Sequence, residues 1–281
     1  MSGPLDGRIA LVTGAGRMRG IGRATALRLS VDGAAVIVSA APRDPSTFPD
    51  DEKAQGWKGA ASVAAEIDAQ GGRAISVDCD VTDVAQVAAM FAAAESRLGT
   101  PDAIVNNAGT AGGAGAKSLL DIDDDTWHRT IDINLNGVYN VCRAAGRAMR
   151  AAGKPGAIVN ISSLAGRSAL ANYGGYCASK FGVIGLTQQL ALELVSLGIR
   201  VNCLCPGLID TDMMDGTFQR LADRSQKSDF ATVKQKAAQA IPMRRQGRPE
   251  EQAAIIAFLL GPESAYMTGQ AVNVDGGVRF D

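Results

Sequence analysis

Two residues whose side chains can move a proton stand four positions apart in the second half of the chain, Tyr176 and Lys180. Positions i and i+4 share one face of a helix, so we expect the lysine ammonium to lie beside the phenol. A cation about 4 Å away contributes on the order of 4 kcal/mol at an effective dielectric of 20, which is roughly three pKa units. The pair therefore predicts a tyrosine of lowered pKa that exchanges a proton with an alcohol or a ketone.

Ser163 precedes the tyrosine by thirteen residues and adds a hydroxyl that can hold a substrate oxygen. The neighbouring Ser162 is a competing hydroxyl. Tyr173 is a competing phenol, but Cys177 rather than a lysine follows it by four residues, so we expect Tyr173 to line the pocket. Taken alone, the tyrosine–lysine pair also fits a half-buried phenol beside a lysine whose charged end reaches solvent.

A glycine-rich segment follows the first apolar run, residues 8–12. Glycines let the backbone approach a ligand closely, and the start of a helix offers free N–H groups with partial positive charge. An isolated glycine cluster also fits an ordinary turn, but this one stands between a strand pattern and a helix pattern, which favours a dinucleotide phosphate site. The residues predicted to form this site are Gly14, Gly16, Arg17, Arg19, Gly20, Ile21 and Gly22.

The glycine loop, Ser163, Tyr176 and Lys180 together resemble the short-chain dehydrogenase/reductase family, in its single-domain branch, which includes 3-oxoacyl-carrier-protein reductases. The resemblance covers the chain from Gly7 to about Gly277 and rests on seven motifs in the order of the family. The further matching residues are Asp80, Val81, Asn107, Ala108, Gly109, Asn134, Pro206, Gly207, Ile209 and Thr211.

The resemblance implies hydride transfer between a nicotinamide dinucleotide and a carbonyl or secondary alcohol carbon. Ser163, whose spacing from the tyrosine matches the family, would hold the substrate oxygen, and Tyr176 would be the general acid and base. Lys180 would hold the nicotinamide ribose, and Asn134 would fix a water that relays protons to solvent. From the residues alone, Asn134 also fits a helix amide that is satisfied locally.

The same resemblance assigns the remaining cofactor contacts. Asp80 and Val81 would meet the adenine. The stretch 107–109 would form the strand end beside the nicotinamide, and residues 206–211 would hold its amide. The glycine loop departs from the family pattern, because five residues rather than the usual three separate Gly14 from Gly20. This departure leaves open which of residues 16–19 faces the phosphates.

The end of the second predicted strand addresses the choice of cofactor. A carboxylate there would accept hydrogen bonds from the ribose 2′-hydroxyl and repel a 2′-phosphate. Residues 38–42 contain no acid, whereas Arg43 follows and can bind phosphate oxygens, with Arg17 or Arg19 adding charge. The sequence therefore favours NADP(H) over NAD(H). If the strand extends further, Asp44 could be the carboxylate that binds the ribose 2′-hydroxyl, so NAD(H) remains an alternative.

Composition excludes several other classes of function. The chain of 281 residues fits one α/β domain, and its apolar content of 46% can form a substantial core. A net charge of −1 gives no electrostatic reason to expect nucleic acid or an acidic membrane as a partner. We find neither an apolar run of the roughly 18 residues that a membrane span needs nor a signal-peptide pattern, so we expect a cytoplasmic protein.

Cysteine and histidine give little support for a disulfide framework or a metal site. The chain has 5 cysteines, an odd number without a C-x-x-C pair, and we expect Cys203 and Cys205 to be small core residues of one strand. His128 is the only histidine and has no ligand-spaced partners, so we expect it on a helix surface.

Strand-like apolar runs alternate with helical patterns along the whole chain, which predicts a doubly wound parallel sheet of Rossmann type, with seven strands and helices on both faces. Ligands of such sheets bind at the carboxyl ends of the strands. The expected strands after the first are at 36–38, 74–77, 103–105, 157–161, 201–204 and 271–274, and the main later helices are at about 84–98, 124–152, 175–197 and 249–260.

Two segments interrupt the alternation. Residues 41–58 form a proline-rich insertion, either a plain surface loop or a contact to the adenosine end of the cofactor. Residues 208–241 predict a lid over the substrate, with apolar residues at helical spacing. The cations expected in solvent on this lid are Arg220, Arg224, Lys227, Lys234 and Lys236, and the residues that suggest an apolar substrate pocket are Met213, Met214, Phe218, Leu208 and Tyr173.

Other readings remain open at this point. The same chemistry with NAD would make an alcohol dehydrogenase, and related chains with retained cofactor catalyse epimerisation or dehydration. A non-catalytic dinucleotide-binding sensor or scaffold is the alternative from another class. A small-molecule ketone or alcohol is the expected substrate. The resemblance and the alanine-rich helices at 124–152 and 175–197 predict a homo-oligomer, a dimer or a homotetramer.

Overall fold

Seven parallel strands form a single sheet in the computed structural model, which describes residues 3–225 and 228–280. The spatial order is β3-β2-β1-β4-β5-β6-β7, so the chain reverses direction across the sheet between β1 and β4. This is the predicted Rossmann-type sheet in one domain. The strands are β1 (Ile9–Val12), β2 (Ala35–Ala40), β3 (Ala74–Asp78), β4 (Ala103–Asn106), β5 (Gly156–Ile161), β6 (Ile199–Pro206) and β7 (Ala271–Val274).

The central strands are apolar along their whole length because both faces of the sheet are covered. Successive side chains of a strand point to opposite faces. Ala10 and Val12 of β1 accordingly pack into the core on one face, and Leu11 packs into the core on the other. All three side chains are fully buried.

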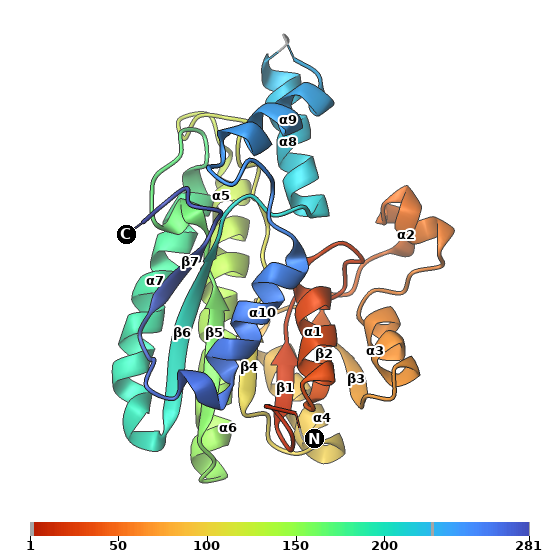
Figure 1. Ribbon diagram of the computed structural model, residues 1–281, viewed down its shortest axis with the longest axis vertical. Helices are drawn as coiled ribbons and strands as arrows, with labels where there is room; N and C mark the ends of the chain where they lie inside the picture. Colours follow the sequence, from red (N-terminus) through yellow and green to blue (C-terminus); the bar gives the residue numbers. More distant parts are fainter. Residues whose placement is uncertain (1–2, 226–227, 281) are drawn as a thin grey trace.

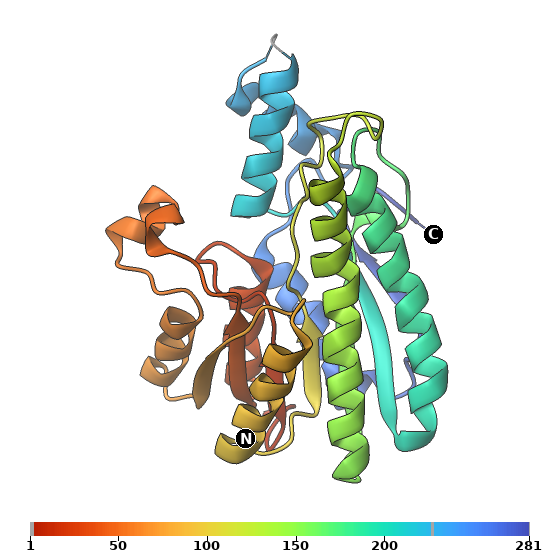
Figure 2. The ribbon, with the colours of Figure 1, turned by 180° about the vertical axis from the view of Figure 1, so that it is seen from behind.

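Helices cover both faces of this sheet. Figure 1 shows α1 and α10 in front of it, and Figure 2 shows α4, α6 and α7 on the opposite face. The first face is covered by α1 (Ile21–Val31), α3 (Ala60–Ala69) and α10 (Pro249–Leu260), and the second by α4 (Val84–Arg97), α6 (Gly137–Ala151) and α7 (Gly174–Leu194).

The helix predicted over 124–152 contains a change of helical type. It consists of α5 (Asp124–Ile131), a π-helical turn η2 (Asp132–Asn136) and α6. A π turn inside a longer helix often marks a functional site. Short 3₁₀ turns complete the connections at η3 (Leu164–Gly166), η4 (Val195–Leu197) and η5 (Pro262–Ser264).

The two segments that interrupt the alternation are both partly helical and both lie toward the carboxyl ends of the strands. The insertion contains η1 (Pro45–Thr47) and α2 (Asp50–Ala54). The 208–241 segment contains α8 (Asp212–Ser225) and α9 (Phe230–Ala240), which rise above the sheet in Figure 1. Among the described residues, no helix is both long and apolar enough to cross a bilayer.

Candidate active site

Tyr176 and Lys180 both lie on α7, whose axis runs beside the sheet from the carboxyl ends of the strands. Lys180 is 5% exposed, and its Nζ donates to the Ile161 carbonyl oxygen at 2.9 Å. The same Nζ lies 5.7 Å from the centre of the Tyr176 ring. The i, i+4 spacing therefore brings the ammonium to the phenol ring, as the sequence predicts.

The pKa of Tyr176 moves in the direction opposite to the prediction. Burial raises the pKa of the phenol above its usual value, and a hydrogen bond with the Ser163 side chain only partly opposes this. Burial also lowers the pKa of Lys180 from 10.5 to about 8. The expectation of a lowered tyrosine pKa was wrong because it counted the attraction of the cation and left out the desolvation of both groups.

The two adjacent serines at the end of β5 have different partners. Ser163 shares the hydrogen bond with Tyr176, and its Oγ also accepts from the Ala165 N–H at 3.1 Å. Ser162 is buried, and its Oγ donates to the Lys180 carbonyl oxygen at 2.7 Å. Ser163 is therefore the hydroxyl beside the phenol, and Ser162 ties β5 to α7.

Asn134 occupies the π turn and is fully buried. Its Oδ1 accepts from the Thr110 N–H at 2.8 Å, and its Nδ2 donates to the Thr110 carbonyl at 3.0 Å and to Ser179 Oγ at 3.2 Å. Ser179 Oγ in turn donates to the Tyr176 carbonyl at 2.8 Å. The amide thus joins the segment after β4 to α7, and its hydrogen bonds are satisfied locally.

Gly109 lies where these groups converge. A methyl group built on it would stand 3.3 Å from Asn134 Oδ1 and 3.7 Å from Lys180 Nζ. The end of β4, the π turn and α7 therefore meet at one point. Two of the residues with predicted catalytic roles, Asn134 and Lys180, lie at this point, and Lys180 in turn lies beside Tyr176.

The glycine loop fits closely against the end of β4. Gly14 has φ +65°, and a Cβ on it would lie 2.5 Å from the Ala108 Cα. Asn107 Nδ2 donates to the carbonyls of Thr13 and Gly14, both at 3.0 Å. A Cβ on Gly22 would meet the same Asn107 amide at 2.6 Å. Glycine is required here by a close approach, and Asn107 serves the architecture of the loop.

The arginines of the enlarged glycine loop are bound to carboxylates. Arg17 Nη2 contacts Asp212 Oδ2 at 2.9 Å. Arg19 contacts Asp210 at 3.0 Å, Asp212 at 3.2 Å and Asp215 at 3.0 Å. All three aspartates belong to the predicted lid segment, so the loop and that segment are joined by an ion-pair network.

The insertion packs onto the same loop through two residues that the sequence analysis did not single out. Glu52 is fully buried, and its Oε1 accepts from Arg17 Nε at 3.0 Å and from the Met18 N–H at 2.8 Å. Trp57 Nε1 donates to the Gly16 carbonyl at 2.8 Å. The sequence did offer a signal for this contact, because a tryptophan within a polar, proline-rich insertion is expected to pack against another part of the protein.

Arg43, predicted to face a 2′-phosphate, is exposed beyond the end of β2. Its Nη2 donates to the Thr47 carbonyl at 3.3 Å, and its guanidinium lies 5.5 Å from the centre of the Phe48 ring. Although the residue is exposed, partial loss of solvent around its guanidinium and the nearby positive charge of Arg17 lower its pKa below the usual value, while Glu52 acts in the opposite direction. Arg43 forms no ion pair with a carboxylate of the described residues.

The remaining predicted contact residues lie at strand ends. Asp80 follows β3, and its Oδ1 accepts from Thr82 N and Oγ1 at 3.0 and 2.8 Å. The neighbouring Val81 is buried. The predicted nicotinamide stretch begins at the end of β6 and reaches the start of α8; its members Pro206, Ile209 and Thr211 are buried and Gly207 is half-buried.

Two of the lid cations, Arg220 and Lys234, lie elsewhere than predicted. Arg220 is half-buried, with Nε donating to the Ala114 carbonyl at 3.1 Å. Arg224 is exposed as predicted, and its Nη1 also donates to the Gly115 carbonyl at 3.5 Å. Lys234 bridges Asp210 and Asp215 at 3.0 and 2.8 Å. Lys236 is exposed as predicted, and Lys227 lies outside the described residues.

The histidine and the two cysteines singled out from the sequence lie where they are expected. Cys79, Cys142, Cys203 and Cys205 are buried free thiols, and His128 is exposed on α5, as predicted. Among the described residues, no three metal-ligating side chains gather.

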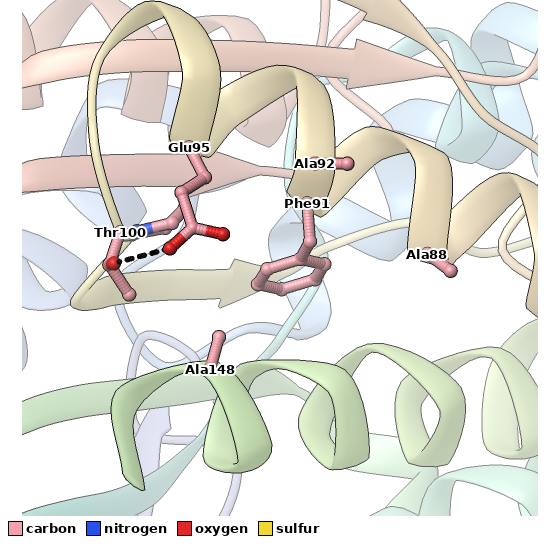
Figure 3. A pocket seen from close by; sticks show the side chains of 7 residues that line it. Ala88, Phe91, Ala92, Glu95, Thr100 and Ala148 are labelled. Atoms are coloured by element: carbon pink, nitrogen blue, oxygen red, sulfur yellow. Dashed lines mark hydrogen bonds between the residues drawn. The ribbon is translucent and has the colours of Figure 1, made fainter. Parts of the chain in front are cut away.

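A cavity of about 280 Å³ lies between α4 and α6 (Figure 3). Phe91 and Ala148 face each other across it, and Thr100 Oγ1 donates to Glu95 Oε1 at 3.3 Å. Thr100 precedes β4, so this cavity is at the amino ends of the strands, away from Tyr176.

Comparison with known proteins supports a common family. The model of a family described as enoyl-(acyl carrier protein) reductase matches residues 14–279. The short-chain reductase protein NovJ of Streptomyces niveus is 40% identical over 269 residues, which cover 96% of this chain and 93% of the relative. The 3-oxoacyl-(acyl-carrier-protein) reductase of Synechocystis sp. is 38% identical over 275 residues, 98% of each protein.

Solved structures agree with this relationship. A crystal structure of an actinorhodin polyketide ketoreductase with NADPH has a TM-score of 0.85 at 33% identity and covers 99% of both chains. NAD⁺-bound xylitol dehydrogenase has the same TM-score and identity, covering 97% of this chain and 99% of its own. Both nicotinamide cofactors thus occur among similar folds. From its sheet, its matching motifs and these relatives, the chain belongs to the short-chain dehydrogenase/reductase family.

Proposed function

We propose that this protein is an NADP(H)-dependent oxidoreductase that transfers a hydride between the nicotinamide and a carbonyl or secondary alcohol carbon. The observation that carries the proposal is the gathering of Lys180, Ser163 and Asn134 near Tyr176: Lys180 Nζ lies 5.7 Å from the ring centre, and Asn134 is linked to the Tyr176 carbonyl through Ser179. This cluster stands at the carboxyl ends of β4 and β5, where ligands of doubly wound sheets bind.

A dinucleotide fits the residues at the neighbouring edge. Gly14 and Gly22 leave no space for a Cβ against their neighbours, so the loop packs closely against the segment that follows β4. The first turn of α1 has no side-chain cap at Gly20, so its N–H groups are available to an anion. These two features support binding of the pyrophosphate, with residues 206–211 holding the nicotinamide amide.

The raised pKa of Tyr176 favours the reductive direction at neutral pH, because the phenol keeps the proton that it must donate. A bound nicotinamide dinucleotide would supply the hydride for the carbonyl carbon. Ser163 holds the carbonyl oxygen, and Tyr176 transfers its proton to that oxygen, which gives the secondary alcohol. Lys180 holds the nicotinamide ribose, and a water fixed near Asn134 returns a proton from solvent through the lysine.

The preference for NADP(H) rests on Arg43 and on the absence of an acid at the end of β2. Arg17 and Arg19 contribute little to the binding of a 2′-phosphate, because carboxylates already neutralise their charges. We expect Arg43→Ala to raise the KM for NADPH at least ten-fold and to leave the KM for NADH within about two-fold. Equal effects on both cofactors would reject this assignment and favour an NAD-linked alcohol dehydrogenase.

A spectrophotometric screen at 340 nm against ketones and alcohols tests the reaction class. A reductase consumes NADPH with a ketone in proportion to the alcohol formed. An epimerase or dehydratase with retained cofactor, or a non-catalytic sensor, shows no net turnover of the cofactor. Absence of turnover with every ketone would overturn the proposed function.

The proposal includes self-association into a dimer or tetramer. Apolar side chains stand exposed on α6 and α7, with Tyr139 44%, Phe181 47% and Leu192 80% exposed. Burying such side chains against a second copy is favourable. Light scattering coupled to gel filtration measures the mass, and a monomer at micromolar concentration would contradict this part.

A further inference from the structure

Arg220 is a cation on the substrate side of the site that lacks an acidic partner. It extends from α8, with Nε on the Ala114 carbonyl at 3.1 Å and Nη2 on Thr217 Oγ1 at 2.8 Å. Both acceptors are neutral. Among residues 3–225 and 228–280, no carboxylate lies within ion-pair distance of this guanidinium.

The guanidinium is one aromatic ring away from the predicted catalytic phenol. Its positive charge reaches Tyr173, where it opposes the rise in pKa that burial causes. The Tyr173 ring packs edge-on against Tyr176, with 6.3 Å between the ring centres. Arg220, Tyr173 and Tyr176 therefore follow one another from the lid to the reacting hydroxyl.

A half-buried guanidinium is costly unless its charge is compensated, and this site leaves it uncompensated by the protein. Arginine carries five N–H donors, and two of its nitrogens are held by Ala114 and Thr217. Those two bonds fix the side chain in place. A planar guanidinium held in this way matches the two oxygens of a carboxylate.

We propose that Arg220 binds a carboxylate of the substrate, so that the enzyme acts on oxo acids rather than on uncharged ketones. The inference rests on the proposed reductase function. Arg220 acts electrostatically on Tyr173, whose ring packs against Tyr176, so the carboxylate held by Arg220 and the ketone at Tyr176 are not adjacent groups of the substrate. The substrate class is therefore an oxo acid whose ketone and carboxylate are separated by an apolar chain.

The test compares three ketones with the purified, cofactor-loaded enzyme: 5-oxohexanoate, its methyl ester and 2-hexanone. We expect kcat/KM for the carboxylate to exceed that for the ester by about ten-fold or more, through KM. Arg220→Gln should bring this ratio close to one while turnover of 2-hexanone changes little. Arg220→Lys should restore part of the preference, because it keeps the charge without the planar fork.

A matched control is Arg245→Gln, since Arg245 is ion-paired with Glu251 at 2.6 Å and stands apart from the three residues described. It should leave the carboxylate-to-ester ratio unchanged. Circular dichroism and thermal unfolding show whether each variant is folded. An equal rate for acid and ester in the wild type, or an unchanged ratio in Arg220→Gln, would overturn the role of Arg220.

Binding of hexanoate to the loaded enzyme by calorimetry is independent of turnover. We expect its affinity to fall at least ten-fold in Arg220→Gln and to stay unchanged in Arg245→Gln. If no ketone reacts, the reductase proposal fails, while this binding result still decides on Arg220. If 2-hexanone reacts without any carboxylate preference and hexanoate binds both proteins equally, only the assignment to Arg220 fails.

Discussion

The arginines of the glycine loop and the arginine of the lid differ in what holds them. Arg17 and Arg19 contact carboxylates from the lid segment and the insertion. Arg220 contacts one carbonyl and one hydroxyl. The paired arginines, Arg17 and Arg19, join segments of the protein. The positive charge of Arg220 is held only by neutral acceptors and therefore stays available to an anionic ligand.

The phosphate end of the crevice is held together by side chains from three segments distant in sequence. Glu52 of the insertion contacts Nε of Arg17, and Asp212 of α8 contacts Nη2 of the same guanidinium. The contacting arginines lie in the part of the loop that is longer than the family pattern. The added length thus gives the loop ionic contacts to both neighbouring segments.

The predicted catalytic end, around Tyr176, is held by neutral hydrogen bonds instead. Asn134 is satisfied by Thr110 and Ser179, and Lys180 donates to the Ile161 carbonyl. A buried lysine with only a carbonyl partner has a lowered pKa, because nothing nearby compensates the loss of hydration. The two ends should therefore respond differently to mutation, pH and salt.

The largest expected effect is at the catalytic end. Tyr176→Phe should reduce kcat about 10³-fold, because the ring remains and the proton donor is lost. Cofactor affinity, measured by NADPH fluorescence, should stay within about two-fold. Tyr173→Phe is the matched control and should keep most of the activity. A kcat for Tyr176→Phe near that of the wild type would refute the acid/base role.

The second prediction concerns how the free energy of unfolding depends on pH through the titration of Lys180. Its folded pKa of about 8 lies below the usual 10.5, so the unfolded chain binds more protons between these values and stability rises with pH across that window. The wild type should gain about 3 kcal/mol relative to Lys180→Met between pH 7.5 and 10.5. Urea unfolding of both proteins measures this difference, and a constant difference would contradict the lowered pKa.

A smaller loss of stability is expected at the phosphate end. Glu52→Ala removes the hydrogen bonds to Arg17 and Met18, which should lower the free energy of unfolding by about 2 kcal/mol. Asp50→Ala is the control, because that carboxylate is fully exposed. Equal urea midpoints for the wild type and Glu52→Ala would show that the insertion does not depend on this contact.

The smallest effect is the coupling across the lid network. A double-mutant cycle of Arg19→Ala and Asp215→Ala, measured by urea unfolding, should give a coupling free energy of about 1 kcal/mol. The value is small because both side chains are partly exposed. The coupling should decrease between 0.05 and 0.5 M NaCl as salt screens it. The same cycle for Arg220 and Thr217 should keep its value in salt. A salt-independent Arg19–Asp215 coupling would mean that the comparison of the two regions is wrong.

The sequence alone determined the sheet, the strand positions and the cluster of Ser163, Tyr176 and Lys180. Apolar runs must be covered on both faces, and residues four apart on a helix must share a face. These are local rules, and the structure follows them from β1 to β7. The resemblance to a family added the order of the motifs and the place of Asn134.

Only the tertiary structure decided the partners of the charged residues. Arg17 and Asp212 are 195 positions apart, and no local period relates them. The same holds for Arg220, which the helical pattern placed in solvent, and for Glu52, which the insertion buries. The sequence also could not predict that the pKa of Tyr176 is raised rather than lowered, because the change depends on how much water the folded chain removes from the phenol.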